Sequence, residues 1–186
     1  MIQKLHNPKT VLYQELKNLV LRDEFCWFWN STSHYDLVEG EYEWENFSFL
    51  SHNFLKRPGD EYLFSSPNSN YTHLAHNVFE EIVRENGILW GAPIECPFVM
   101  YRANANMTIP SGTGEALIGP PHRDHQYPHK NILIYLTDCN GGPTIVGEEK
   151  YFGQEDEVIL FQGEHQGCTP VTDRRVILVF TFYDFK

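Results

Sequence analysis

The sequence predicts a single α+β domain, built mainly of β-strands with flanking helices, and three observations lead to this class. Aromatic residues make up 15% of the 186 residues, which suits a packed β-rich domain better than a disordered chain. Two segments in the first half carry apolar residues at helical spacing. From Pro97 onward the chain becomes a series of short apolar runs separated by turn residues, as in consecutive strands.

Charge and hydropathy limit the partners of this domain. The formal net charge of −11 argues against charge-driven binding to bulk nucleic acid, which needs Lys and Arg gathered on one face. A nucleobase held in a small pocket stays compatible with this charge. The N-terminal segment lacks the apolar core of a signal peptide, and no run reaches the length of a membrane span. We therefore expect a cytoplasmic protein without membrane contacts.

The cysteines do not form a recognisable redox or metal motif. None lies in a Cys-x-x-Cys pair, so neither a zinc ribbon nor a thioredoxin-like site is expected. The chain is large enough to fold without disulfides, and we expect buried free thiols. The four residues are Cys26, Cys96, Cys139 and Cys168.

The first half of the chain, residues 1–95, is expected to support the β-rich second half within one domain over 1–186. A first helix is predicted over 9–21, because apolar Val and Leu residues recur there at helical spacing. Asn7 is predicted as its N-cap, with Pro8 in the first turn.

The rest of the first half is predicted as one strand, a loop region and a second helix. The aromatic run over 25–29 is predicted as a buried strand. Residues 30–70 are rich in Ser, Asn, Tyr and Gly, and we expect loops with short strands such as 47–50. A second helix is predicted over 71–86 and ends at Gly87. Both helices are expected to cover the outside of a sheet.

The second half, residues 96–186, is expected to form the core of the domain. Its predicted strands are 98–106, 131–136, 157–161 and 174–180. Between them lie a Ser-Gly-Thr-Gly loop and an Asn-Gly-Gly-Pro turn, whose glycines permit tight backbone turns.

Two residues of a His-x-Asp pair, His122 and Asp124, are candidate metal ligands. On an extended segment the spacing of two places both side chains on one face. His165 directly follows an apolar run that is predicted as a strand, and it is the candidate third ligand. Two imidazoles and one carboxylate on one face of a metal leave the opposite positions open, which suits non-haem Fe(II) and O2 chemistry.

Two further histidines close to this pair are alternatives. His125 and His129 would allow a His-rich zinc site. His125 adjoins Asp124 and is expected to face the other way on an extended segment, and His129 follows Tyr127-Pro128 in a predicted loop. We expect a surface or pocket-rim role for both.

The order of these features is similar to that of a known enzyme family. It runs from His-x-Asp through an apolar strand ending Tyr135-Leu136, a Gly-Gly turn followed by Thr, and a strand ending in Phe161, to His165 and an Arg at the head of the last strand. This order resembles the Fe(II)/2-oxoglutarate-dependent dioxygenases, within them the prolyl 4-hydroxylase-like branch, over roughly residues 101–182. The resemblance implies a double-stranded β-helix (jelly-roll) core that closes round the three ligands.

The resemblance also implies the cofactors and their residues. Fe(II) would be held by the three ligands named above, and the cosubstrates would be 2-oxoglutarate and O2. A basic residue at the start of the last strand would bind the distal carboxylate of 2-oxoglutarate, because a guanidinium matches a carboxylate in two hydrogen bonds. Arg174 and Arg175 compete for this role, and we favour Arg174 on its spacing from His165. Tyr135 would hydrogen-bond the same carboxylate.

The resemblance suggests hydroxylation of a C–H bond, with release of succinate and CO2. A prolyl residue in a peptide or free proline is the expected substrate, and a small metabolite or a modified nucleobase is the alternative. Tyr101 and the polar residues Arg102, Asn104 and Asn106, which share one face of a predicted strand, are candidate substrate or cosubstrate contacts. The alternative for these polar residues is an exposed sheet face.

Two other functions fit the same architecture. One is a jelly-roll binding module that keeps a metal without oxidising anything, and the other is a cupin-type metal isomerase, which would use more His ligands. In an iron-dependent oxygenase the metal-bound imidazoles must be neutral. We therefore expect iron affinity to fall as the pH drops through about 6.5, the usual pKa of histidine.

Overall fold

The computed structural model describes residues 1–30, 47–58, 64–90 and 97–185. The elements in these ranges are β1 (Gln3–Leu5), α1 (Val11–Leu21), β2 (Phe28–Asn30), β3 (Phe49–Lys56), β4 (Ser66–Pro67), α2 (Thr72–Glu85), β5 (Phe98–Thr108), β6 (Lys130–Tyr135), β7 (Thr144–Val146), β8 (Glu149–Tyr151), β9 (Val158–Phe161), β10 (His165–Gly167) and β11 (Arg175–Asp184).

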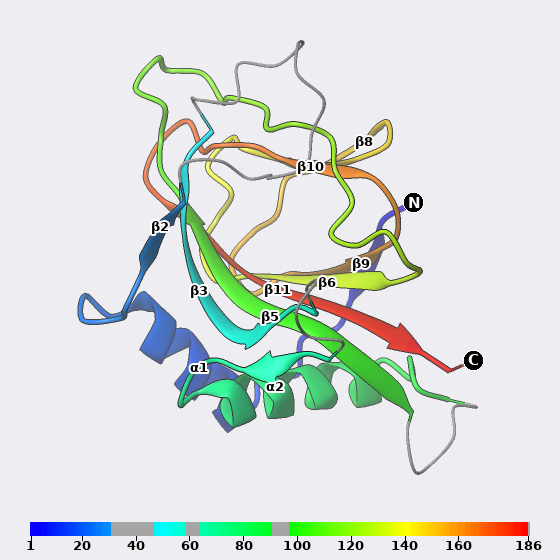
Figure 1. Ribbon diagram of the computed structural model, residues 1–186. Coiled ribbons are helices and arrows are strands. Elements are labelled where there is room, and N and C mark those ends of the chain that lie inside the picture. Colours follow the sequence, from blue (N-terminus) through cyan, green and yellow to red (C-terminus); the bar gives the residue numbers. More distant parts are fainter. Residues whose placement is uncertain (31–46, 59–63, 91–96, 186) are drawn as a thin grey trace.

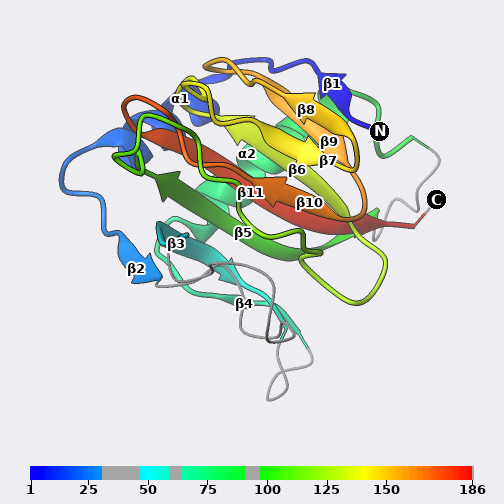
Figure 2. The same cartoon turned by 90° about the horizontal axis from the view of Figure 1, so that it is seen from above.

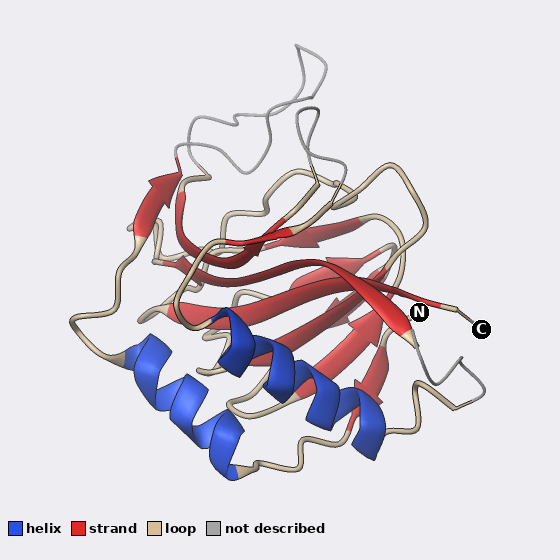
Figure 3. Cartoon of the chain, turned by 60° about the horizontal axis from the view of Figure 1, so that its bottom comes forward, coloured by secondary structure: helices blue, strands red, loops and turns tan. Residues whose placement is uncertain are grey.

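The strands form two antiparallel sheets in a layered arrangement. The larger sheet has the order β1-β9-β6-β11-β5-β3-β2, with β4 paired to β3, and the smaller sheet has the order β10-β7-β8. Both helices lie on one face of the larger sheet, and the smaller sheet lies over its other face (Figures 1 and 3). The predicted jelly-roll fold with flanking helices is confirmed. Strands from both halves of the sequence build the larger sheet, since β1 pairs with β9 and β3 pairs with β5.

The last strand shows how the sequence divides the core into two parts. In β11 the residues Val176, Leu178 and Phe180 join the cluster under the helices, whereas Ile177 and Val179 join the cluster between the two sheets. Because side chains alternate along a strand, the apolar run 176–180 of one strand serves both layers. Seen from above in Figure 2, β11 lies in the middle of the molecule, between β6 and β5.

The two predicted helices are present, with one corrected boundary. α1 begins after Thr10, whose side chain accepts a hydrogen bond from the amide of Tyr13, so Thr10 and not Asn7 is the N-cap. Asn7 instead donates to the carbonyl of Asp156. α2 ends before Gly87, as predicted, and Gly87 has a φ of +62°, the left-handed conformation common at helix ends. Neither described helix has the length and apolarity needed to cross a bilayer.

The prediction of a buried aromatic strand over 25–29 is wrong in its extent. Only Phe28–Asn30 forms a strand, at the edge of the larger sheet, and Phe28 and Trp29 are exposed. Phe25 is buried as predicted. The reason is topological: β2 is the last strand of the sheet and pairs with β3 alone among the described strands, so its position and not its hydrophobicity decides its exposure. Most of residues 30–46 lie outside the described ranges.

The expectation of buried free cysteines holds for two of the four. Cys139 and Cys168 are buried and free, whereas Cys26 is free but exposed. Cys96 lies outside the described residues.

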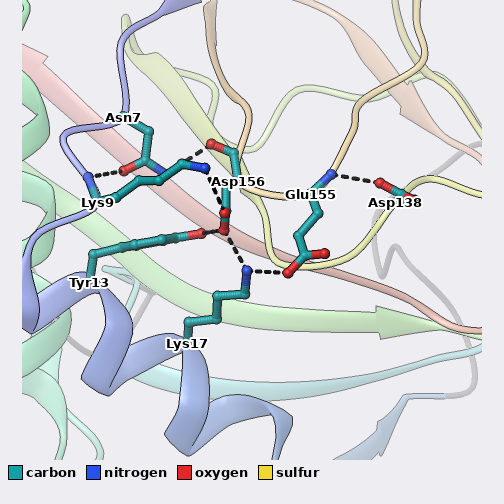
Figure 4. A network of polar contacts seen from close by, with 7 residues as sticks. All are labelled: Asn7, Lys9, Tyr13, Lys17, Asp138, Glu155 and Asp156. Atoms are coloured by element: carbon teal, nitrogen blue, oxygen red, sulfur yellow. Dashed lines mark hydrogen bonds and ion pairs between the residues drawn. The ribbon is translucent and has the colours of Figure 1, made fainter.

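A polar network fixes α1 to the turn before β9 (Figure 4). Asp156 accepts a hydrogen bond from the Tyr13 hydroxyl at 2.6 Å and forms ion pairs with Lys17 and Lys9. Lys17 also pairs with Glu155. Burial alone would raise the pKa of Asp156, but the bonds from Lys17 and Tyr13 lower it to about 2, so the carboxylate stays ionised. The backbone amide of Asp156 donates to the carbonyl of Tyr135, which connects this network to the last residue of β6.

Replacing Lys17 by methionine is expected to lower the free energy of unfolding by about 2–4 kcal/mol, because it leaves a carboxylate without its buried partner. The Lys17 side chain is 9% exposed, and methionine keeps its aliphatic stem. Lys9 is the matched control, since it pairs with the same Asp156 but is 54% exposed. Lys9→Met should cost less than about 1 kcal/mol. Urea unfolding of both variants checks this, and equal losses would contradict a special role of Lys17.

Candidate active site

The three predicted metal ligands meet in one place. One ligand atom each from His122, Asp124 and His165 lies within 4.8 Å of the others. The rings of the two histidines are 4.3 Å apart, and His165 Nε2 lies 3.5 Å from Asp124 Oδ2. The backbones of His122 and His165 form an antiparallel bridge, with both hydrogen bonds at 2.9 Å. This bridge brings residues 43 positions apart in the sequence side by side.

Backbone carbonyls select the ring nitrogen that each histidine offers. His122 Nδ1 lies 3.0 Å from the carbonyl oxygen of Pro120, and His165 Nδ1 lies 3.3 Å from that of Gly163. A carbonyl only accepts hydrogen bonds, so each Nδ1 carries the proton and donates it. Each Nε2 is then the lone-pair atom, as a metal ligand requires.

Asp124 completes a donor set that fits a divalent iron ion. Its Oδ1 accepts a hydrogen bond from Arg102 Nη1 at 2.8 Å. Its Oδ2 is buried and has no hydrogen-bond donor among the described residues. A buried carboxylate oxygen that faces two imidazole nitrogens and lacks a donor is suited to a metal. Two neutral imidazoles and one carboxylate form the set typical of non-haem Fe(II).

The buried setting keeps all three ligands in their metal-binding protonation states. Burial, followed by the neighbouring His165, lowers the pKa of His122 to about 4. Burial also lowers the pKa of His165. For Asp124 burial alone would raise the pKa, but His165 and the Arg102 guanidinium outweigh it and hold the pKa well below the usual range.

The pH dependence expected from unperturbed histidines therefore moves to lower pH. A lowered pKa means that the imidazole stays neutral, and able to bind metal, below its usual value of about 6.5. Affinity for Mn(II) or Zn(II) should thus be flat from pH ~7.5 to ~5.5 and fall only as the pH approaches the value of about 4 for His122. Metal titrations at several pH values check this, and a tenfold loss centred near pH ~6.5 would contradict it.

A second cluster, the anion pocket of Arg175, Tyr135 and Thr144, lies between the two sheets. Arg175 Nη2 donates to Thr144 Oγ1 at 2.7 Å, and the Tyr135 hydroxyl lies 2.7 Å from the same oxygen. The Arg175 guanidinium carbon lies 5.5 Å from the centre of the Tyr135 ring. Arg175 is 3% exposed, and no carboxylate in the described part of the chain pairs with it. A buried cation without a counter-ion indicates an anionic ligand.

The expectation that Arg174 points inward is wrong by one residue. Arg174 is half-buried, and its Nη2 lies 3.4 Å from the carbonyl oxygen of Leu21 at the end of α1. Asp173, with a φ of +56°, ends the preceding turn, and β11 begins at Arg175 opposite Thr108. Alternation along the strand then places Arg175 and not Arg174 on the inner face.

The pairing of the smaller sheet sets the distance between the anion pocket and the triad. His165 is opposite Val146, and Gly167 is opposite Thr144, so Thr144 lies two residues along the sheet from His165. Two residues of a strand span roughly 7 Å. Arg175 bonds Thr144, so its guanidinium is held at a point of the smaller sheet that is close to His165.

The polar residues of β5 line the inner face between these two places. Asn104 is opposite Val179 and Asn106 is opposite Ile177, and both partners belong to the cluster between the sheets. Asn104 is fully buried and donates to Asn106 through its side chain, while its Oδ1 lacks a partner among the described residues. The alternative of an exposed sheet face is thereby excluded for Asn104.

The rings of Tyr101, His125, Tyr127 and His129 pack together into a wall beside the triad. His125 stacks on Tyr127 at 4.8 Å and contacts Tyr101 at 5.4 Å and His129 at 5.0 Å. His125 and His129 are buried, so a surface position is excluded for both, whereas the alternative of a pocket-rim role stays a prediction. His125 Nε2 bonds Thr181 and is not directed at the triad. Neither residue belongs to the metal group, which argues against the His-rich zinc site.

Three further residues support the site without a predicted role in it. Thr144, which the sequence places only after a turn, bonds both Arg175 and Tyr135. Gly153 packs against Tyr135, and a Cβ there would lie 2.4 Å from the ring, so only glycine allows this position of Tyr135. Asn131 is fully buried on the inner face, with both side-chain polar atoms lacking partners among the described residues. An Asn at the start of an otherwise apolar strand was the signal for the last of these.

Comparison with known proteins gives similarity in structure and not in sequence. No protein-family model and no curated protein matches the chain. Among solved structures, an oxidoreductase of the 2OG-Fe(II) oxygenase family from Burkholderia pseudomallei matches with a TM-score of 0.57 and 14% identity over 74% of this chain and 68% of that one. AviO1 from Streptomyces viridochromogenes Tue57 matches with a TM-score of 0.53 and 13% identity over 99% and 90%. The viral collagen prolyl hydroxylase vCPH from Paramecium Bursaria Chlorella virus-1 matches less well, with a TM-score of 0.46 and 12% identity over 73% and 80%, which does not identify a substrate.

Proposed function

The chain has the fold found in 2OG-Fe(II) oxygenases, and we propose that it is an Fe(II)- and 2-oxoglutarate-dependent hydroxylase. The observation that carries this proposal is the buried Arg175, which has no counter-ion in the described chain and bonds Thr144, two residues along the smaller sheet from the residue opposite His165. A metal-binding module or an isomerase on the same fold would have no use for such a cation. The triad alone would not distinguish these functions.

Each residue of the proposed site has a separate task. His122, Asp124 and His165 would hold Fe(II) on one face, and the metal would supply the oxidative chemistry with O2. Arg175 would bind the distal carboxylate of 2-oxoglutarate through charge-assisted hydrogen bonds, with Tyr135 beside it.

The surroundings of these residues would orient the cosubstrate and exclude water. Asn104 and Asn106 would offer amide groups along the path between the metal and the anion pocket. The apolar cluster between the sheets, which includes Leu133, Val146 and Ile177, would surround the carbon chain of the cosubstrate and keep water out.

For the substrate, we propose a compact molecule that packs against the rings of Tyr101, His125 and Tyr127. Tyr127 is 38% exposed and lies at the outer end of this wall, next to buried His125. Aromatic walls suit a ring of aliphatic carbons, so a prolyl residue in a peptide or free proline is the first substrate to test. A small metabolite or a modified nucleobase is the alternative.

Turnover of 2-oxoglutarate tests the proposal directly. The protein with Fe(II), ascorbate and O2 should release succinate, slowly alone and faster with a substrate from a panel of prolyl peptides, free proline and nucleosides. Mass spectrometry of the panel then identifies the hydroxylated compound. A protein that binds iron but releases no succinate under any of these conditions would be a binding module or an isomerase.

A further inference from the structure

We propose that Arg102 is a positioning residue that limits Asp124 to one metal-binding oxygen, an inference that rests on the proposed metal site. The two carboxylate oxygens have different surroundings. Oδ1 accepts from Arg102 Nη1 at 2.8 Å, whereas Oδ2 faces His165 Nε2 at 3.5 Å and has no donor among the described residues. One oxygen is thus engaged by the guanidinium and the other is left for the metal.

Asp124 needs such a restraint because no strand pairing holds its own backbone in place. Unlike Arg102, it lies outside every strand, in the segment that follows the isolated bridge at His122. Arg102 lies on β5, which is paired on both sides, with β11 and with β3. The charged groups of the pair are buried, with 12% of the Arg102 side chain and 5% of the Asp124 side chain exposed. Arg57 adds a weaker contact from its Nη1 to the Asp124 carbonyl oxygen at 3.3 Å.

The restraint matters for the number of open metal positions. If Asp124 bound the metal through both oxygens, it would fill a position that the oxo acid or O2 needs. A guanidinium bonded to Oδ1 prevents this mode, since it holds that oxygen away from the metal. Arg102 also offsets the negative charge of Asp124, and the metal-loaded centre then attracts a dianionic oxo acid more strongly.

Water-proton relaxation of the Mn(II)-loaded protein tests this inference without any turnover. In Arg102→Gln, a second carboxylate oxygen on Mn(II) should displace one bound water relative to the wild type. The affinity for 2-oxoglutarate should fall roughly 10-fold or more, because the second oxygen of Asp124 would compete with the oxo acid for one position on the metal. The affinity for Mn(II) should change less, because loss of orientation weakens binding while loss of a nearby positive charge strengthens it.

Arg123→Gln is the matched control. Arg123 lies between the two ligands in the sequence, and its side chain is exposed. Its substitution therefore removes the same charge next to the site without removing the hydrogen bond to Asp124 Oδ1, which Arg102 donates. It should leave the water count unchanged and alter the 2-oxoglutarate affinity less than threefold. Arg102→Lys keeps the charge on a shorter stem and should restore part of the lost affinity.

Three outcomes separate this inference from the proposed function. An unchanged water count in a folded Arg102→Gln variant would overturn the positioning role. A loss of 2-oxoglutarate affinity that is equal in Arg102→Gln and Arg123→Gln would reduce Arg102 to a general charge effect, and would also overturn it. If the wild type itself binds Mn(II) no better than Asp124→Ala does, the metal site fails, and the proposed function fails with it.

Discussion

Replacing Arg175 by alanine is expected to raise the 2-oxoglutarate concentration needed for half-maximal turnover by roughly 30-fold or more. The substitution would remove the proposed buried, charge-assisted pair with the distal carboxylate, and losing such a pair costs on the order of 2–5 kcal/mol. The neighbours Thr144 and Tyr135 remain, but neither carries a positive charge. Succinate release at a series of 2-oxoglutarate concentrations measures the effect.

Arg174→Ala is the control for this prediction, because it removes the same charge one residue away. Its side chain contacts the end of α1 at Leu21 and not the anion pocket, so the 2-oxoglutarate requirement should change little. A large effect of Arg174→Ala with a small effect of Arg175→Ala would mean that the inner face of β11 has been misassigned. If neither variant changes the requirement, the protein does not bind 2-oxoglutarate through this pocket.

Replacing Asp124 by alanine is expected to reduce iron-dependent turnover to background. The change removes the only carboxylate of the triad, and two histidines hold Fe(II) much less firmly than three ligands. Glu164→Ala is the matched control, since Glu164 is exposed and adjoins the ligand His165 in the sequence. It should keep nearly full turnover, and retained turnover in Asp124→Ala would contradict the triad.

Asp124→Ala also leaves the buried Arg102 without its partner, so a loss of stability must be separated from a loss of metal. The double variant Asp124→Ala/Arg102→Met removes both charges. It should recover part of the thermal stability lost in the single variant, because the two residues interact directly, and it should still lack turnover. Recovered turnover in the double variant would show that Asp124 serves the fold and not the metal.

Local patterns in the sequence were sufficient for the two helices and for the proximity of His122 and Asp124. α2 and its end at Gly87 follow from apolar spacing and from a residue that tolerates positive φ. His122 and Asp124 share a face because they are two residues apart on an extended segment. These features depend on residues that are close together in the chain, and the sequence shows such local spacing directly.

Tertiary structure decided which residues complete the site. The choice between Arg174 and Arg175 depends on where β11 begins, and the pairing of Arg175 with Thr108 decides that point, which spacing from His165 misplaced. Arg102 was assigned to the substrate pocket, but it bonds Asp124, because the fold brings β5 against the His122–Asp124 segment.

The same limit explains the misjudged exposure of other residues. Phe28 and Trp29 are apolar but exposed, whereas His125 and His129 are polar but buried. The hydrophobicity of a side chain favours its burial, but the pairing of distant strands decides which face of a strand is covered. The sequence by itself therefore determined the class of fold, the two helices and the proximity of His122 and Asp124. Only the packing of the two sheets decided the register of β11, the partner of Asp124 and the composition of the anion pocket, because each of these depends on contacts between segments far apart in the chain.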